Sequence, residues 1–411
     1  MSLASTKLRP IHPFPARMAP SIIQRRLKSA KPMRVVDPMA GSGTTIVTAR
    51  IHGHEALGFD TDPLALLIAK TWSSDVDGEK LSVLAAKTLN DARQCYRSLN
   101  VGRAYPASAN KETRAFVRFW FDSTNRRQLT ALSLSISKVK DKTAQAVLWC
   151  AFSRMIITKG AGVSLAIDVS HSRPHRAYGV ALIKPFAKFL HAVEQVLRAS
   201  RFSPVQKLPK ANVRRGDARC IPLDDHSVDL VITSPPYVNA IDYLRGHKLS
   251  LVWMGHQIAE LRNLRSTNIG SEKSRQPRGI DHYRNTAERV VQKYSELPKR
   301  SQAMLSQYFQ DMDCVLAEIS RILKRRGKAV IVVGNSTIRG VFVSTSRVLT
   351  HLARANGMQL LSARKRDLKE SKRYLPPPGN ATSGVTLRSR MNEEVILTFQ
   401  KTPAGAKGRN P

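Results

Sequence analysis

Short apolar runs recur along the chain, each bounded by Gly, Pro or Asp, and such runs predict buried strands of an α/β sheet. They occupy residues 33–37 (MRVVD), 54–60 (HEALGFD), 213–218 (VRRGDA), 228–234 (VDLVITS), 329–335 (AVIVVGN) and 393–399 (EEVILTF). Between the first two runs, GSGTT predicts a tight turn that opens a helix, which gives a strand–helix–strand unit. The last run is expected to close the edge of the sheet.

Two long segments do not follow the strand pattern. Residues 75–205 carry apolar side chains at helical spacing, as in AQAVLWCAFSRMI and FAKFLHAVEQVL. Because a crossover between parallel strands needs only about 30 residues, most of this stretch is expected to be a helical insertion. Residues 256–300 are polar and basic with little strand or helix pattern, which predicts a loop that is either disordered or reads nucleic acid.

These patterns divide the chain into an α/β core and two candidate recognition segments. The predicted bounds are 1–74 for an N-terminal arm and the first part of the core, 75–205 for the helical insertion, 206–255 for further core strands, 256–300 for the basic polar loop, 301–400 for the rest of the core and 401–411 for a flexible tail.

The charge balance predicts a polyanionic partner. Lys and Arg number 67 against 30 Asp and Glu, for a formal net charge of +37. Nucleic acid is favoured, because neutralising its phosphates releases counterions. The arm from Met1 to Val36 contains no acidic residue and is expected to lie on or beside phosphate. A membrane surface is less favoured, since no amphipathic basic helix and no 18-residue apolar run stands out; the remaining alternative is a merely soluble basic surface.

The four cysteines carry no metal-site or disulfide spacing. No CxxC pair occurs among Cys95, Cys150, Cys220 and Cys314, and no metal-binding cluster is apparent. The amino terminus lacks the apolar core of a signal peptide, so we expect a reducing, cytoplasmic compartment.

The segment DPMAGSGTT (37–45) predicts a ligand loop between a strand and a helix. A phosphate-binding P-loop is excluded because no Lys precedes Thr44, and a dinucleotide fingerprint would need a glycine where Ile46 stands. What remains is a glycine loop that follows an acid. Asp37 could pair with a ligand ammonium, which the methionine part of S-adenosylmethionine has and NAD lacks.

Two further acids end predicted strands. Asp60 could accept hydrogen bonds from both ribose hydroxyls, and Asp217 from an adenine amino group. Each acid alone is more often a helix cap or a solvated loop residue. With Asp37, three acids at successive strand ends favour one shared site.

The fourth predicted strand stops at a proline pair in TSPPY (233–237), because Pro235 and Pro236 cannot continue a sheet ladder. A simple strand terminator is one interpretation. The other is a rigid pocket wall formed by Ser234 to Tyr237 at a strand's carboxyl end, where open α/β sheets bind ligands.

Taken together, HPFPARMAP (12–20), DPMAGSGTT (37–45), GFD (58–60), GDA (216–218) and TSPPY (233–237) resemble the DNA amino-methyltransferases, which methylate exocyclic amines of cytosine or adenine. The joint occurrence is more specific than either main motif, and it covers about half the chain. The resemblance implies an α/β, Rossmann-like class I methyltransferase core with a mostly parallel seven-stranded sheet. It also implies S-adenosyl-L-methionine as cofactor and double-stranded DNA as substrate, in the cytoplasm of a bacterium or archaeon or encoded by a phage, with a cognate restriction endonuclease as candidate partner.

The resemblance also assigns residues. Ser234, Pro235, Pro236 and Tyr237 would be catalytic, and Phe14 would lie against the methionine part of the cofactor. The cofactor-binding set it implies is Phe14, Asp37, Pro38, Ala40, Gly41, Ser42, Gly43, Thr44, Asp60, Asp217 and Ala218.

An aryl amine is a poor nucleophile, because its lone pair is delocalised into the ring. The Ser234 hydroxyl oxygen and the Pro235 carbonyl could each accept one amino hydrogen and turn that lone pair toward the methyl group. Tyr237 could stack on a base flipped out of the duplex. In the resembling family, serine before PPY goes mostly with cytosine, which predicts N4-methylcytosine; N6-methyladenine, an RNA base methylation and an inactive nucleic-acid-binding protein are the alternatives.

Other chemistries fit the sequence less well. Methylation at carbon 5 of cytosine needs a nucleophilic cysteine in a Pro-Cys context, and the cysteines here follow Gln94, Trp149, Arg219 and Asp313. Ser234 has no His–acid arrangement that would make it a nucleophile.

Two further segments carry weaker signals. Residues 239–253 predict a helix behind the pocket, in which Asn239, Asp242, Tyr243 and Arg245 could contact the base or its phosphates, or simply pack. HSRPHR (171–176) resembles a segment of the same branch without an assigned mechanism; a basic helix end on phosphate is the alternative.

Overall fold

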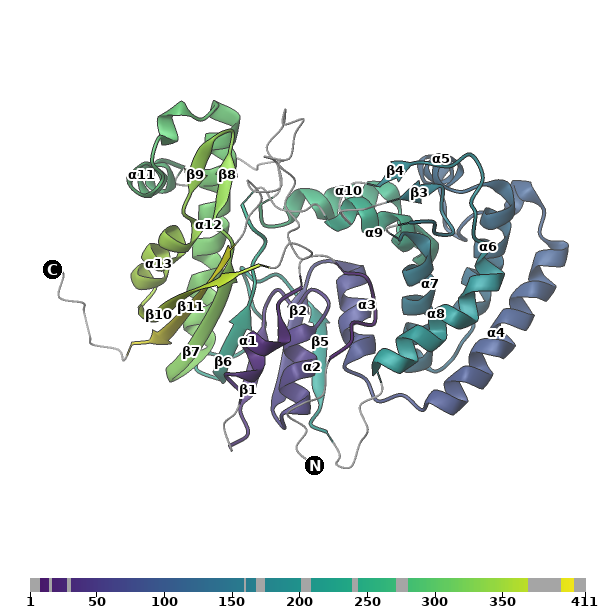
Figure 1. The fold of residues 1–411 in the computed structure, drawn as a ribbon, viewed down its shortest axis with the longest axis horizontal. Coiled ribbons are helices and arrows are strands. Elements are labelled where there is room, and N and C mark those ends of the chain that lie inside the picture. Colours follow the sequence, from purple (N-terminus) through teal and green to yellow (C-terminus); the bar gives the residue numbers. More distant parts are fainter. Residues whose placement is uncertain are drawn as a thin grey trace.

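The computed structural model describes residues 8–14, 17–27, 31–158, 160–167, 174–200, 208–238, 243–270, 280–368 and 393–402, with the side chains of 280–282 left out. A seven-stranded sheet forms the centre of one half of the molecule (Figure 1). A group of helices forms the other half.

The sheet has the strand order β10-β11-β7-β6-β1-β2-β5. The strands are β1 (Arg34–Asp37), β2 (Glu55–Asp60), β5 (Ala211–Arg215), β6 (Val228–Thr233), β7 (Leu323–Val333), β10 (Met358–Asp367) and β11 (Glu393–Lys401). Five of them pair in parallel, from β5 through β2, β1 and β6 to β7, whereas β11 runs antiparallel to both of its neighbours. This is the Rossmann-like core of class I methyltransferases, and the predicted fold class is confirmed.

Alternating strand residues bury both faces of the sheet. On β1, Val35 faces a cluster with α1 (Pro20–Gln24), α2 (Thr44–Ile51) and α3 (Pro63–Trp72). Val36 faces the opposite cluster with α12 (Lys299–Ile322) and α13 (Thr345–Ala355). Helices on both faces explain why these strands read as continuous apolar runs in the sequence.

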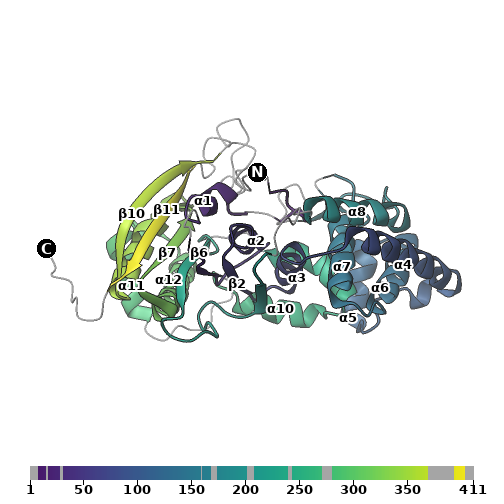
Figure 2. The same ribbon diagram turned by 90° about the horizontal axis from the view of Figure 1, so that it is seen from below.

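The predicted insertion is helical, as expected. It contains α4 (Gly78–Ser98), α5 (Lys111–Trp120), α6 (Ser123–Ser137), α7 (Lys142–Ile156) and α8 (Pro185–Ser200), together with the short elements η2 (Val101–Arg103), β3 (Ala166–Ile167) and β4 (His175–Arg176). We call residues 78–200 the helical lobe. One apolar cluster joins it to Ile68 and Trp72 of α3, so the lobe packs directly on the core, as both views show (Figure 2).

The prediction of little helix in residues 256–300 is wrong. The described part contains α10 (Ile258–Thr267), α11 (Ile280–Val290) and η4 (Tyr294–Glu296). Gln257 and Glu260 form a capping box at the start of α10, a readable start signal among residues whose polar composition suggested a loop. Residues 271–279, between the two helices, lie outside the described part.

The two helices belong to different parts of the molecule. On the side of the helical lobe, Thr113 of α5 donates a hydrogen bond to the Gln257 side chain and accepts one from the Ile258 backbone. On the other side, Ala287 of α11 joins the apolar cluster of α12 and α13. One predicted loop is therefore two helices that lie on either side of the strand ends.

The edge of the sheet also differs from the prediction. The late strand β11 lies between β7 and β10, so the edge strand is β10. β10 escaped prediction because its outer half, ARKRD, is mostly exposed and carries no apolar run. A hairpin of β8 (Ser336–Ile338) and β9 (Val341–Val343) adds a separate two-stranded sheet.

The helix predicted at 239–253 is present from residue 243 as α9 (Tyr243–Leu251), followed by η3 (Val252–Met254). Asn239 and Asp242 lie outside the described residues, as do 171–173 of HSRPHR and residues 403–411 of the tail. His175 and Arg176 form strand β4, so the interpretation of HSRPHR as a helix end is wrong. In the described part of the chain, no helix is both long and apolar enough to span a bilayer.

Candidate active site at the carboxyl ends of the strands

The glycine loop between β1 and α2 has the backbone that only glycine adopts readily. Gly41 has φ +49° and Gly43 has φ +84°, and Gly43 is the N-cap of α2. A Cβ atom on Gly43 would lie 2.8 Å from the Cβ atom of Ala69 in α3. Pro38, Ala40, Ser42 and Thr44 are buried within or beside this loop. Close packing of α3 therefore requires glycine at 43.

Asp60 ties the end of β2 to the glycine loop. Its Oδ2 atom accepts a hydrogen bond from the Gly41 backbone N–H at 2.8 Å, and its Oδ1 atom accepts one from Asp62 N–H at 2.9 Å. Burial, with a further contribution from the nearby Asp62 charge, raises the pKa of Asp60 to about 7 despite these hydrogen bonds. Asp60 is thus a carboxyl group that changes charge near neutral pH.

Asp37 joins the two main sequence motifs. The Thr233 hydroxyl at the end of β6 donates to its Oδ1 atom at 2.7 Å, and the Met39 backbone N–H donates to the same atom at 3.2 Å. Burial raises the pKa of Asp37 to about 6, while the hydrogen bonds from Thr233, Thr45 and Met39 work in the opposite direction. One buried carboxyl group therefore fixes the start of TSPPY against the glycine loop.

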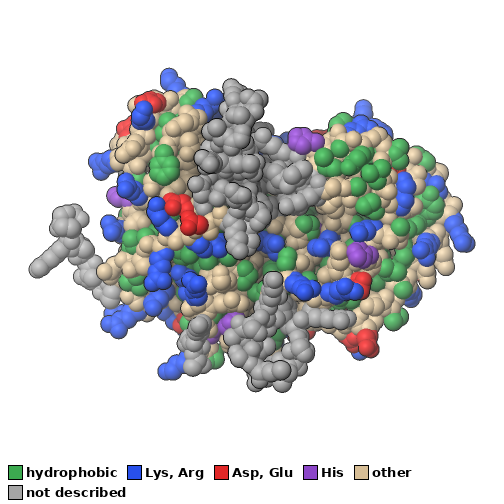
Figure 3. Space-filling model, viewed as in Figure 1, with side chains coloured by type: hydrophobic (Ala, Val, Ile, Leu, Met, Phe, Trp, Pro, Cys, Tyr) green, Lys and Arg blue, Asp and Glu red, His purple; other side chains and the backbone are tan. Residues whose placement is uncertain are grey.

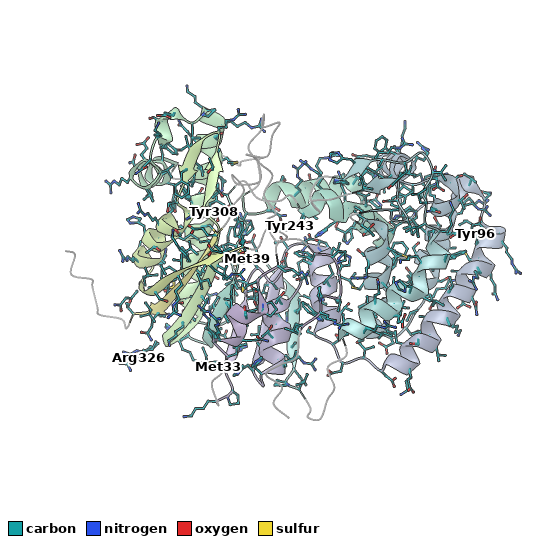
Figure 4. All side chains as sticks on the ribbon, in the orientation of Figure 1. Met33, Met39, Tyr96, Tyr243, Tyr308 and Arg326 are labelled. Atoms are coloured by element: carbon teal, nitrogen blue, oxygen red, sulfur yellow. The ribbon has the colours of Figure 1, made fainter. Side chains whose placement is uncertain are left out.

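Phe14 lies over the glycine loop, as the sequence predicted for a residue at the cofactor. A Cβ atom built on Gly41 would meet the Phe14 ring at 3.4 Å. The Phe14 ring also stacks on the ring of Tyr243 in α9, with 5.5 Å between centroids and 14° between planes. Its centroid lies 5.3 Å from that of the His247 ring. Figure 4 labels Tyr243 and Met39 in the middle of the molecule, and Met33 at the opposite end of β1.

A buried Asp–His pair supports this aromatic group. His247 Nδ1 lies 2.5 Å from Asp62 Oδ2, and Asp62 also caps α3 by accepting from Leu64 N–H. Burial opposes ionisation of Asp62, but His247 and the backbone donors hold its pKa below the ordinary value. Sequence reasoning missed this pair: Asp62 before Pro63 could have been read as a cap, whereas nothing local marked His247.

Asp217 does not end the third strand as predicted, because β5 ends at Arg215 and Asp217 lies in the turn that follows. Its carboxylate pairs with Arg219 at 2.6 Å, and Arg219 also pairs with Asp311 of α12 at 2.8 Å and donates to the Thr267 carbonyl of α10. Burial opposes ionisation of Asp217, yet the bonds from Arg219 hold its pKa below the ordinary value. The next residue, Ala218, is buried.

Arg219 therefore acts as a clamp between three elements. Next to it, Thr61 donates to the Asn268 side chain at 3.1 Å, so the end of α10 contacts the loops that follow both β2 and β5. This places a helix of the 256–300 segment beside the acids at the strand ends.

The backbone of the TSPPY wall is held from the far side. Tyr308 of α12 donates to the Pro236 carbonyl at 2.8 Å, and Ser336 of β8 donates to the Val238 carbonyl at 2.9 Å. Pro235 is buried, and Ser234 is half-buried. Two hydroxyl groups thus fix the wall that two prolines stiffen.

Tyr237 is anchored through its hydroxyl. It donates to Glu394 Oε1 at 3.1 Å, and Arg366 pairs with Glu394 at 2.6 Å. Burial and the Glu394 charge raise the pKa of Tyr237 well above the ordinary value. Sequence reasoning missed Tyr308, Glu394 and Arg366, because they reach the site from α12, β11 and β10 without any local motif. The stacking role of Tyr237 stays a prediction.

The structure thus brings the predicted residues together at the carboxyl ends of the parallel strands. Asp217 is joined to the others through Arg219 and α10. Among the described residues, no group of three or more His, Cys, Asp or Glu side chains is placed to hold a metal ion.

The known proteins to which the sequence is similar include several Type II methyltransferases, all at low identity. No protein-family model matches the chain. It is 21% identical over 418 residues to the Type II methyltransferase M.MvaI of Kocuria varians, covering 95% of this chain and 90% of that protein. It is 21% identical to the Type II methyltransferase M.BsoBI of Geobacillus stearothermophilus, covering 79% and 73%. With M.AvaI of Nostoc sp. it shares 26% identity over 149 residues, 31% of that protein.

Among solved structures, a SAM-dependent methyltransferase from Methanosarcina mazei aligns with 94% of this chain and 98% of its own at 8% identity, with a TM-score of 0.34. At that score the likeness adds nothing to the strand order described above. The core of the chain is thus a Rossmann-like class I methyltransferase fold, and over most of its length the sequence is similar to Type II methyltransferases.

Proposed function

We propose that the protein is an S-adenosylmethionine-dependent DNA methyltransferase that modifies the exocyclic N4 amine of cytosine in double-stranded DNA. The observation that carries the proposal is the Thr233–Asp37 hydrogen bond, which sets the TSPPY wall directly against a glycine loop of cofactor-binding type. The similarity to Type II methyltransferases, across 95% of the chain in one case and 79% in another, supports it.

The residues at the strand ends fit this cofactor. An ionised carboxylate accepts up to about four hydrogen bonds, and the two backbone bonds to Asp60 leave capacity for ribose hydroxyls. Phe14 covers the loop beside Gly41, where it would contact the methionine part, and Asp37 would attract its ammonium group. Asp217 would accept from the adenine amine. When bound, the cofactor supplies an electrophilic methyl group on a sulfonium.

The protein's own contribution is to bind the target amine through hydrogen-bond acceptors, so that its nitrogen can act as the nucleophile. Ser234 Oγ and the Pro235 carbonyl each accept a hydrogen bond from one N–H of the amine. This arrangement turns the nitrogen lone pair out of the ring plane. As positive charge grows on nitrogen, both oxygens stabilise it. The Pro236 carbonyl, bound by Tyr308, keeps the wall in position. Positioning of this kind supplies much of the rate in a bimolecular transfer.

Target recognition is assigned to α10 together with the helical lobe. The carboxyl end of α10 contacts the loops after β2 and β5, and its amino end contacts α5. The two recognition candidates of the sequence therefore meet in space. A cognate restriction endonuclease remains a candidate partner, and the protein is expected to act where DNA lies, in the cytoplasm.

The assignment to cytosine rests on Ser234. In the resembling proteins, a serine before PPY is found mostly in enzymes that methylate cytosine, whereas aspartate or asparagine is found mostly in those that methylate adenine. The serine side chain is shorter than either of these two. The larger ring of adenine would need more room between the wall and the methyl group.

Mass spectrometry of nucleosides tests the proposal. DNA from cells that express the protein should contain N4-methylcytosine, and the Ser234→Ala variant should lose nearly all transfer while keeping its cofactor affinity, because Ser234 acts mainly in the transition state. Ser227→Ala is the matched control. Ser227 immediately precedes β6, whereas Ser234 immediately follows it, and this variant should transfer methyl groups normally. If the DNA contains N6-methyladenine and no N4-methylcytosine, the assignment to cytosine is wrong. If a methylated base appears only in RNA, the assignment to DNA is wrong, and if none appears, the proposed activity is wrong.

A further inference from the structure

The helical lobe is bonded to the part of the N-terminal arm that carries Phe14. The Arg154 side chain of α7 donates to the Ile11 backbone carbonyl at 3.0 Å, and His12 Nε2 lies 3.0 Å from the hydroxyl oxygen of Ser153, also in α7. The Ile11 side chain is fully buried in the apolar cluster that joins the lobe to α3. Both views show this part of the arm, in dark purple, between α3 and the lobe (Figure 1, Figure 2). Residues 11 and 12 are therefore fixed to a helix that lies 141 to 143 positions later in the sequence.

A turn centred on a proline extends this attachment to Phe14. The Phe14 backbone N–H donates to the His12 carbonyl at 2.8 Å, which closes a three-residue turn around Pro13. The proline ring fixes φ close to the value that such a turn requires, so His12 and Phe14 have little freedom to move independently. Beyond the turn, the Phe14 ring lies over Gly41 of the glycine loop. The position of the Phe14 ring thus depends on where His12 is held.

The contacts of the arm with α7 lie among buried polar groups. His12 and Ser153 are both buried, and so is Ser250 of α9, to which Ser153 donates at 2.9 Å. A buried polar group that loses its partner costs free energy, so these contacts hold the arm more firmly than exposed ones would. Arg154 also donates to Gln195 of α8 at 2.8 Å, which links the arm to the packing of α7 against α8.

We propose that Ser153 and Arg154 of the helical lobe are positioning residues for the cofactor, because through His12 and Ile11 they hold Phe14 over the glycine loop. This inference rests on the proposed cofactor role of Phe14. It gives the lobe a second task beside target recognition, since the lobe then completes the end of the cofactor site that receives the methionine part.

Ser153→Ala tests the contact with His12 and changes the shape of the side chain little. The variant loses the hydroxyl group beside His12, which frees the arm at one of its two polar attachments. Its affinity for S-adenosylmethionine, measured by titration calorimetry, should fall roughly 3- to 10-fold, as for loss of one buried hydrogen bond. Its affinity for duplex DNA without cofactor, measured by fluorescence anisotropy, should stay unchanged. An equal loss of DNA affinity would indicate general damage to the lobe and would overturn the inference.

Ser250→Ala is the matched control for Ser153→Ala. It removes the partner of Ser153 in α9 and leaves the contact between Ser153 and His12 in place. It should bind S-adenosylmethionine like the unmodified protein. Equal losses in the two variants would contradict the inference, because the effect would then pass through α9 and not through the arm. Unfolding midpoints show whether either variant is misfolded.

Arg154→Met tests the second attachment independently of the serines. It removes the bonds to both Ile11 and Gln195 while keeping an apolar side chain of similar length, whereas Gln195→Ala removes only the bond to α8. Only Arg154→Met should weaken binding of S-adenosylmethionine, again roughly 3- to 10-fold. A loss of the same size in Gln195→Ala would assign the effect to the packing of α7 on α8, and the inference would be wrong.

A double variant shows whether Ser153 acts through Phe14. In Phe14→Ala the ring is already absent, so adding Ser153→Ala should lower the affinity for S-adenosylmethionine by less than twofold. If the two losses multiply, Ser153 affects the cofactor site by another route, and its assignment as a positioning residue for Phe14 fails.

A readout that needs no cofactor keeps the inference separate from the proposed function. Hydrogen exchange measured by mass spectrometry should become faster in residues 11–14 of both Ser153→Ala and Arg154→Met, and should stay unchanged in α1. If the unmodified protein binds no S-adenosylmethionine but the variants show this change, the proposed function is wrong and the attachment of the arm stands. If exchange becomes faster while S-adenosylmethionine binds as tightly as before, or if exchange does not change in either variant, the inference is refuted.

Discussion

At the scale of single residues, the site is organised by carboxyl groups that accept hydrogen bonds from the backbone of the glycine loop. Asp60 accepts from Gly41 and from Asp62, and Asp37 accepts from Thr233 and Met39. Removal from water raises the pKa of Asp60 to about 7 and that of Asp37 to about 6, against the effect of these hydrogen bonds, so both are sensitive to conditions near neutral pH. These hydrogen bonds hold the glycine loop to the ends of β1 and β2.

Asp60→Ala should weaken binding of S-adenosylmethionine by roughly 1–3 kcal/mol, the cost of losing hydrogen bonds to a charged acceptor. Titration calorimetry measures the change. Asp91→Ala, on the exposed surface of α4, is the control and should bind like the unmodified protein. An unchanged affinity in folded Asp60→Ala would remove Asp60 from the cofactor site.

Stability should depend on pH through Asp60 when no cofactor is bound. The pKa of this carboxyl group is raised in the folded protein, so between about pH 4 and pH 7 the folded state holds a proton that the unfolded chain has released. Its contribution to the free energy of unfolding is therefore greatest at low pH and decreases as pH rises through that window.

Asp60→Asn removes this dependence. Urea unfolding at a series of pH values should show the variant gaining stability relative to the unmodified protein from about pH 4 to pH 7, by at most about 1.4 kcal/mol per pH unit. A difference between the two proteins that stays constant over this range would contradict the raised pKa.

At the scale of elements, the site is assembled by contacts between segments far apart in the sequence. Arg219 joins the loop after β5 to α12 and to the end of α10, and Thr61 joins the loop after β2 to Asn268. α10 is therefore the part of the 256–300 segment that lies at the strand ends, whereas α11 packs on α12 and α13.

This difference predicts which helix takes part in target recognition. Arg262 lies on α10 and Arg289 on α11, and both are exposed. Arg262→Ala should weaken sequence preference on DNA without changing cofactor binding, while Arg289→Ala makes the same charge change and should leave the preference intact. Methylation of substrates with single base changes measures it.

The variant Arg262→Ala also breaks the ion pair with Glu112 of α5. Glu112→Gln breaks that pair from the other side and serves as its control, since an exposed pair contributes at most about 1 kcal/mol. Loss of preference in Arg289→Ala alone would move the recognition region to α11.

At the scale of the whole molecule, positive charge is the dominant surface feature. The formal net charge is +37, and Figure 3 shows Lys and Arg side chains spread over both the sheet core and the helical lobe, with few Asp and Glu on this face. Such a surface attracts the phosphates of a duplex from many directions.

DNA affinity should accordingly fall steeply with salt. The plot of log affinity against log salt concentration should have a slope with a magnitude on the order of 5 or more, because each neutralised phosphate releases close to one counterion. Fluorescence anisotropy with a labelled duplex at several salt concentrations gives the slope. A slope near zero would exclude a phosphate-dominated interface.

Much of the core could be predicted from the sequence, because its determinants are local. Apolar runs that end at Asp37, Asp60 and Thr233 marked three central strands, and the backbone of the glycine loop followed from Gly41 and Gly43. The helical lobe was visible from apolar spacing alone. Local patterns suffice where a strand or helix buries a whole face, since burial then dictates the residue types.

What the local patterns misjudged were elements with little buried surface. β10 presents a mostly exposed, charged outer half, so no apolar run announced it, and α10 and α11 are polar helices whose buried sides are narrow. Their formation depends on neighbours, since β10 is completed by pairing with β11 and α11 by packing on α12. Contacts of this kind leave only a weak signal in the sequence of the element itself.

The sequence by itself determined the central strands of the sheet, the glycine loop and the acids that follow those strands, because each is set by neighbours within a few positions. Only the tertiary structure decided that Thr233 binds Asp37, that Tyr308 holds the Pro236 carbonyl and that Glu394 stands behind Tyr237. These partners are separated by 72 to 196 positions, and hydrogen bonds between buried polar groups at such separations depend on how the layers pack. That packing places them in contact, and burial then makes each bond costly to break.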